Sequence, residues 1–169
     1  MIFVSRFFAV VLLATLGACS QSAGLQRSVD IEADKAAINA IGDLWMAAYE
    51  AGDYDAIIDL YTEDAWIMAR GRPKLEGRAA IGRSFGGLAA GRKVNIDIVV
   101  EELEVIHDWA WLVSEFTVTY GADNGEKPPV QETARSLLIY RKGADGKWRI
   151  HRDMDSPAPD VDMKPPASS

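Results

Sequence analysis

Cysteine and histidine are scarce in this chain of 169 residues, which has one cysteine, Cys19, and two histidines, His107 and His151. A single cysteine excludes an intramolecular disulfide. Two histidines, one of them in a predicted tight turn, are too few for the usual zinc sites. The sequence therefore predicts no metal and no other cofactor.

Runs of basic residues are also missing, and the formal net charge is −7. An acidic surface repels phosphate backbones, so nucleic acid is not expected as a partner. The chain has no Gly-x-Ser-x-Gly nucleophile motif. Gly86-Gly87 lacks the spacing of a phosphate-binding loop. These absences argue against a serine hydrolase and against a nucleotide-binding enzyme.

The N-terminus has the pattern of a targeting segment, with an apolar run over Phe7–Leu16 that is too short to span a bilayer. The following Leu-Gly-Ala-Cys resembles the bacterial lipoprotein signal, in which the cysteine becomes the lipidated first residue. We therefore expect a lipoprotein signal peptide over residues 1–18, lipidation of Cys19 and a tether over residues 19–29. Ser20 resembles the sorting pattern for the outer membrane, which implies a lipid anchor there, facing the periplasm. The alternative is an ordinary secretory signal with an incidental cysteine.

Residues 30–156 are predicted to form one α+β domain, followed by a disordered, proline-rich tail over residues 157–169. Hydrophobic periodicity and turn residues predict helices first and long strands later. The predicted helices are Asp30–Ala51, a short one after Asp53, and about Arg78–Leu88. The predicted strands are Ala65–Ala69, Leu75-Glu76, Val94–Ile106, Trp109–Tyr120, Val130–Arg141 and Trp148–Asp155.

Side chains alternate along a strand, so the turns sort the strand residues into two faces. The first set is Ile96, Ile98, Val100, Trp109, Trp111, Val113, Glu115, Arg135, Leu137, Ile139, Trp148, Ile150, Arg152 and Met154. The second set is Leu112, Ser114, Phe116, Val118, Tyr120, Ser136, Leu138, Tyr140, His151, Asp153 and Asp155. Both sets are largely apolar, yet helices can cover only one face. We expect a homodimer through Trp109, Trp111 and Trp148 on the other face, or else a tail or tether that covers it.

The order of helix, helix, short hairpin, helix and four long strands resembles the nuclear transport factor 2-like superfamily. The segments Trp45–Ala65 and Leu75–Ile81 look like its SnoaL-like and ketosteroid-isomerase-like branch, and Asp145–Ile150 with Arg152–Met154 resembles further relatives. The resemblance implies a cone-shaped curved antiparallel or mixed sheet with three N-terminal helices on its concave face. It also implies a pocket between them, and dimers formed through the convex face.

The chemistry of the isomerases can be compared residue by residue. The resemblance puts their carboxylate base at Ala69, their tyrosine at Trp45 and their second acid at Leu138. None of the three groups is present, so that mechanism does not carry over. Because the second acid faces the pocket in that family, Leu138 implies that the second set of residues is concave.

The second set then contains the candidate site. His151 and Asp153 form a hypothetical acid/base pair, with His151 as the base. The predicted ligand-binding residues are Trp45, Tyr49, Tyr61, Trp66, Phe116, Ser136, Leu138 and Asp155. The alternatives are that His151 is a satisfied core residue and that Trp45 and Tyr61 only pack in the core.

Three functions follow from these residues. The first is an envelope lipoprotein that binds a small apolar or amphipathic molecule in its pocket. The second is an enzyme for proton transfer, of the isomerase, cyclase or dehydratase type, that uses His151 and Asp153. The third is a dimeric adaptor with a purely structural role.

Overall fold

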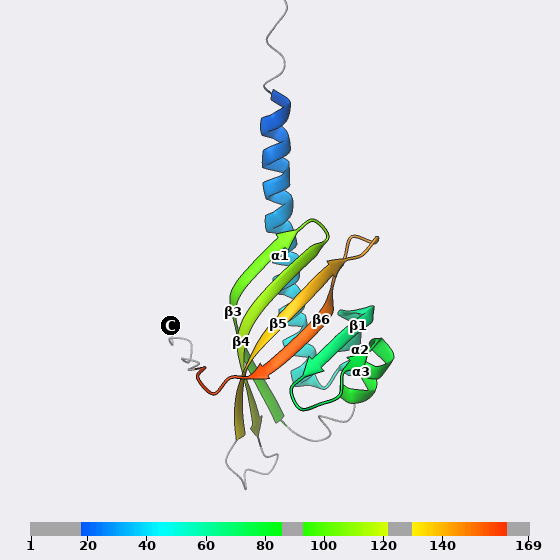
Figure 1. Ribbon diagram of the computed structural model, residues 1–169, viewed down its shortest axis with the longest axis vertical. Coiled ribbons are helices and arrows are strands. Elements are labelled where there is room, and N and C mark those ends of the chain that lie inside the picture. The colour runs from blue at the N-terminus through cyan, green and yellow to red at the C-terminus, as the bar shows by residue number, and fades with distance from the viewer. Residues whose placement is uncertain (1–17, 86–92, 122–129, 162–169) are drawn as a thin grey trace, which may run out of the picture.

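The computed structural model describes residues 18–85, 93–121 and 130–161, which form three helices and six strands (Figure 1). Most of the predicted signal peptide, the end of the third predicted helix and the last residues of the tail lie outside these ranges. The elements are, in chain order, α1 (Ala18–Ala51), α2 (Tyr54–Asp59), β1 (Tyr61–Ala69), β2 (Leu75–Glu76), α3 (Arg78–Phe85), β3 (Lys93–Ile106), β4 (Trp109–Gly121), β5 (Val130–Lys142) and β6 (Trp148–Pro157).

Helix α1 is longer than predicted, because it begins at Ala18 rather than at Asp30. It therefore includes residues 19–29, which the sequence pattern assigned to a tether. No proline interrupts this stretch, and Gly52 follows its end with a φ of 71°, a conformation that glycine adopts without steric cost. Figure 1 shows α1 passing behind the sheet and projecting beyond it. No helix in the described ranges is both long and apolar enough to cross a membrane.

The six strands form one mixed sheet in the order β2-β1-β6-β5-β4-β3. The pair β1–β6 is parallel, and every other pair is antiparallel. The sequence predicted such an α+β fold. We call the face that carries Leu112 and Leu138 the inner face, and the opposite face the outer face. One apolar core joins the inner face to all three helices, with Ile38, Ile57 and Ile81 fully buried.

A bulge in β3 corrects the first predicted set of residues. Val100 pairs with Ser114 but Glu102 pairs with Val113, so Glu101 is an extra residue in the ladder. One extra residue reverses the facing of the rest of the strand. Ile96, Ile98 and Val100 therefore lie on the inner face, where they line a cavity.

A second irregularity, in β6, corrects the placement of the last strand. Tyr140 pairs with Ile150 but Ile139 pairs with Arg152, so His151 is the extra residue. Trp148 and Ile150 consequently face inward and are buried. The predicted place of Trp148 at a dimer contact is therefore wrong. Its indole nitrogen donates a 2.8 Å hydrogen bond to Asp34 Oδ1 in α1.

The beginning of the predicted tail is ordered. Strand β6 runs to Pro157, and Ala158 and Val161 are buried. The Ala158 amide donates to Thr133 O at 3.0 Å, and Arg135 pairs with Asp160 at 2.9 Å. Both partners belong to β5, so the segment after β6 covers part of the outer face. That was one of the two coverings that the sequence left open.

Candidate functional site

A cavity of about 770 Å³ lies between α1 and the inner face of the sheet. Its walls are mostly apolar and aromatic, because α1 presents one helical stripe and each strand presents alternate residues. Trp45 and Tyr49 of α1 stack with ring centroids 5.0 Å apart. A cavity of this size and lining is typical of sites for small organic molecules.

The inner face carries one row of polar side chains across this apolar surface. Ser114, Ser136 and Asp155 are register neighbours on β4, β5 and β6. The Oγ atoms of Ser114 and Ser136 are 2.7 Å apart and hydrogen-bonded. Both hydroxyls and the Asp155 carboxyl line the cavity. A bound molecule with one polar group therefore finds hydrogen-bond partners in this row.

Tyr61 and Asp153 lie beside this row. The Tyr61 hydroxyl donates a 2.7 Å hydrogen bond to Asp153 Oδ2, and Trp45 Nε1 donates to the same hydroxyl at 3.3 Å. Tyr61 is fully buried, and burial raises its pKa well above the ordinary value of a tyrosine. The phenol therefore stays protonated and acts as a donor to Asp153.

Asp153 and Asp155 form a carboxyl pair with raised pKa values. Both point to the inner face and hydrogen-bond each other. Burial is the main cause of the raised pKa in both groups, and the charge of Asp155 raises that of Asp153 further. Two close carboxylates in an apolar site cannot both ionise easily. The pair therefore retains a proton at a higher pH than an exposed aspartate, as an acid/base group requires.

His151 is not part of this site, although the sequence predicted it beside Asp153. As the extra residue of β6, its ring turns to the outer face and packs edge-on against Trp109, with centroids 5.3 Å apart. Its Nδ1 lies 3.0 Å from Thr62 Oγ1 and 3.6 Å from Asp64 Oδ1. The predicted pair of His151 and Asp153 is therefore not formed.

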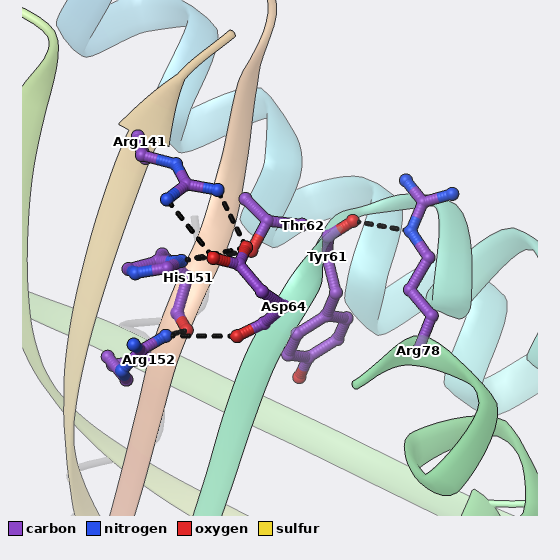
Figure 2. A network of polar contacts seen from close by, with 7 residues as sticks. All are labelled: Tyr61, Thr62, Asp64, Arg78, Arg141, His151 and Arg152. Atoms are coloured by element: carbon purple, nitrogen blue, oxygen red, sulfur yellow. Dashed lines mark hydrogen bonds and ion pairs between the residues drawn. The ribbon is translucent and has the colours of Figure 1, made fainter. Parts of the chain in front are cut away.

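Figure 2 shows the polar network that holds His151, with Tyr61 pointing away from it. Arg141 donates to Asp64 at 2.6 and 3.3 Å, and its guanidinium lowers the pKa of that carboxyl to about 2. Burial lowers the pKa of His151, and the charges of Arg152 and Arg141 lower it further. His151 is therefore a neutral, hydrogen-bonded core residue, the alternative that the sequence allowed.

Trp66 also lies outside the cavity. Ile67 and Ala69 of β1 line the cavity, so alternation turns Trp66 to the outer face. There two cations lie over its ring, with Lys74 Nζ 3.7 Å and Arg152 Cζ 4.1 Å from the centroid. Trp66 braces β1 against β2 and β6 and does not contact the cavity.

The other predicted ligand-binding residues do line the cavity, and their part in binding stays a prediction. They are Trp45, Tyr49, Tyr61, Phe116, Ser136, Leu138 and Asp155. Arg72, Tyr120 and Tyr140 also line the cavity, although the sequence did not predict them as ligand-binding residues. Tyr120 and Tyr140 were in the concave set, whereas Arg72 comes from the β1–β2 turn. In the described ranges, no three histidine, cysteine or acidic side chains converge as a metal site would require.

Residues 43–151 match the family model of the SnoaL-like domain. No curated protein matches the chain. Among solved structures, an NTF2-like protein with a cystatin-like fold from Novosphingobium aromaticivorans is similar with a TM-score of 0.69. It shares 19% identity over 87% of this chain and 94% of its own.

Two further structures carry functional names. A ketosteroid isomerase-like protein from Erwinia carotovora atroseptica has a TM-score of 0.63 and 23% identity, over 77% of this chain and 96% of its own. A proposed dehydratase of the NTF2-like family from Streptomyces avermitilis has a TM-score of 0.67 and 20% identity, over 75% and 98%. At these identities the likeness establishes the fold.

Proposed function

The chain belongs to the SnoaL-like domain family, and from this premise we propose that its cavity binds a small, mainly apolar or amphipathic molecule. The supporting observation is the cavity of about 770 Å³, whose mostly apolar walls carry a row of polar side chains. Apolar walls supply affinity, and a few fixed polar groups supply orientation. Ser136, Asp155 and Asp153 would then be available to a polar group in the body of a ligand.

A matched pair of substitutions tests this proposal. Leu138 lines the cavity, whereas its neighbour Leu137 is 40% exposed on the outer face. We expect the chain to bind the neutral apolar dye N-phenyl-1-naphthylamine saturably. Leu138→Trp should abolish this binding by filling the cavity, and Leu137→Trp should leave it intact. Absence of saturable binding in the unsubstituted chain, or equal binding by both variants, would overturn the proposal. Circular dichroism establishes that each variant is folded.

Proton transfer is the second candidate function, and the Asp153–Asp155 pair favours it. Asp155 takes the place that the sequence analysis gave to His151, because Asp155 lines the cavity and His151 does not. A carboxyl group with a raised pKa in an apolar cavity can remove and return a proton next to a carbonyl group. The dehydratase and isomerase-like names among the structural relatives are consistent with such chemistry.

Exchange of α-hydrogens for deuterium in an apolar cyclic ketone, followed by NMR, measures this activity. We expect Asp155→Asn to slow the exchange by about 100-fold or more, the usual contribution of a positioned acid/base group. His151→Gln is the control and should exchange at the original rate. Exchange no faster than in buffer, or equal losses in both variants, would exclude Asp155 as the base.

Membrane attachment and self-association are separate proposals. We propose that Cys19 carries a lipid that anchors the protein in the bacterial envelope, at the outer membrane facing the periplasm. Measurement of the intact mass after expression in a bacterium, with Cys19→Ser as the control, tests whether Cys19 carries a lipid.

A second copy of the chain, in a ligand-binding homodimer or in an adaptor, would bind to the uncovered part of the outer face. There Trp109 is 46% and Met154 is 45% exposed. Sedimentation of Trp109→Glu would detect the loss of such a contact.

A further inference from the structure

One end of the cavity carries a positive charge that has no anionic partner among the described residues. Arg72 lies in the turn between β1 and β2 and lines the cavity together with Tyr49 and Tyr120. These two tyrosines hydrogen-bond each other, and burial raises the pKa of Tyr49 to about 12. The positive charge of Arg72 acts on the Tyr49 hydroxyl in the opposite direction, so the guanidinium is near it. A cation and a hydrogen-bonded pair of phenol groups therefore line this end of the cavity.

No carboxylate partner of Arg72 is found among the described residues, and of the arginines there that form no such pair, Arg72 is the one that lines the cavity. The guanidinium groups of Arg78, Arg135, Arg141 and Arg149 each pair with an aspartate or glutamate. The chain has 25 acidic against 18 basic residues, so acidic partners are not in short supply. A guanidinium that faces a cavity and lacks an internal anion is well suited to an anion on a ligand.

The cavity is also elongated. The side of α1 that lines it extends from Glu32 to Tyr49. At 1.5 Å of rise per residue, this wall is roughly 25 Å long. The opposite wall consists of the apolar residues of β3 and β4, including Ile98, Leu103 and Phe116. Such a space fits a chain better than a compact ring.

We propose that the cavity binds an elongated amphiphile with one terminal carboxylate, whose carboxylate meets Arg72 and the Tyr49 and Tyr120 hydroxyls while its apolar chain lies along α1. This assignment rests on the proposed binding function and specifies the class of ligand. A carboxylate can accept two parallel hydrogen bonds from a guanidinium, and its remaining lone pairs can accept hydrogen bonds from phenol groups. The apolar chain gains affinity by leaving water.

The test compares two ligands that differ only in the head group, decanoate and decanol, by calorimetric titration at pH 8. We expect decanoate to bind about tenfold or more tightly than decanol, in keeping with a charge-assisted hydrogen bond. Arg72→Gln should remove this preference, because it should weaken the binding of decanoate much more than that of decanol. Arg70→Gln is the matched control, because Arg70 lies two residues away and does not line the cavity. This control should retain the preference for decanoate.

Two results separate this inference from the broader function. The proposed carboxylate site is wrong if decanoate and decanol bind with equal affinity. It is also wrong if Arg70→Gln and Arg72→Gln reduce the affinity for decanoate equally. In both cases the cavity still binds apolar molecules. If neither these ligands nor the neutral apolar dye bind, the proposed binding function is wrong, and the inference fails with it.

Discussion

The Tyr61 hydroxyl and the Asp153 carboxylate lie 92 positions apart in sequence and are joined by a buried hydrogen bond of 2.7 Å. The parallel pairing of β1 with β6 brings them together, and Trp45 of α1 completes the contact. This bond connects β1 with β6, and both of its side chains line the cavity.

Tyr61→Phe should therefore destabilise the protein. The substitution keeps the ring but removes the phenol donor of the buried Asp153 carboxyl, which costs about 1–3 kcal/mol in free energy of unfolding. Tyr54→Phe is the control, since the buried Tyr54 hydroxyl has no hydrogen-bond partner among the described residues. It should change the stability little. Urea unfolding measures both, and equal losses would contradict the assignment of the bond.

Asp153→Asn should change the dependence of stability on pH. Because the folded-state pKa of Asp153 is raised, its contribution to stability is fully present below the unfolded value of about 4. That contribution is lost as the pH rises through the folded-state value. The variant cannot ionise, so it should be more stable at pH 8 by roughly 1–3 kcal/mol and show a flatter profile.

Asp145→Asn is the opposite case. Its hydrogen bonds to Arg149 lower the pKa of Asp145, so the stabilising contribution of this aspartate is present at neutral pH and lost as the pH falls. The Asp145→Asn variant should therefore lose less stability in acid than the unsubstituted protein. It should still show the decrease in stability above pH 4 that comes from Asp153. Denaturant unfolding between pH 3 and pH 8 distinguishes the two variants. An unchanged profile in Asp153→Asn would contradict the raised pKa.

His151→Gln should reduce the loss of stability in mild acid. The folded-state pKa of His151 is lowered, so the neutral ring is favoured by folding. Stability from this group is therefore present above the unfolded value of about 6.5 and is lost as the pH falls. His107→Asn is the control, because His107 is exposed in the turn between β3 and β4. Identical pH profiles for both variants would contradict this role of His151.

Trp148→Phe tests the corrected position of this side chain. The buried indole donates to Asp34, which also pairs with Lys142 at 2.7 Å. We expect a loss of about 1–3 kcal/mol that does not depend on protein concentration. Trp111→Phe is the control, since the hydrogen bond of Trp111 to Glu102 is exposed, and it should cost under about 1 kcal/mol. A loss for Trp148→Phe that grows on dilution would instead place Trp148 at a subunit contact.

The order of elements and the inner position of Phe116, Ser136, Leu138 and Asp155 could be predicted from the sequence. Turn residues fix where each hairpin begins, and strict alternation then sorts the strand residues into two faces. Which of the two faces is the inner one was implied by the family resemblance, through Leu138. Alternation fails wherever a strand contains an extra residue. Nothing in the composition around Glu101 or His151 marks these bulges, because their conformations are set by packing against neighbouring strands.

The contact between Tyr61 and Asp153, and the position of Arg72 in the cavity, were harder to predict. Tyr61 meets Asp153 only through the parallel pair β1–β6, and pairing between distant strands has no local signal. Alternation along a regular strand consequently predicted His151 beside Asp153, whereas the His151 ring lies on the other face. Arg72 was missed because a turn residue reveals its direction only when the hairpin is placed.

The extra residue in β6 has a consequence for how this strand can change in length. Trp148 and Ile150 precede it, Asp153 and Asp155 follow it, and all four point inward. Removing His151 would leave a regular strand that still presents both pairs to the interior, at the expense of the outer polar network. Adding one residue elsewhere between Ile150 and Asp153 would turn one of the pairs outward. Variants of this protein should therefore tolerate a shortening of β6 by one residue much better than a lengthening.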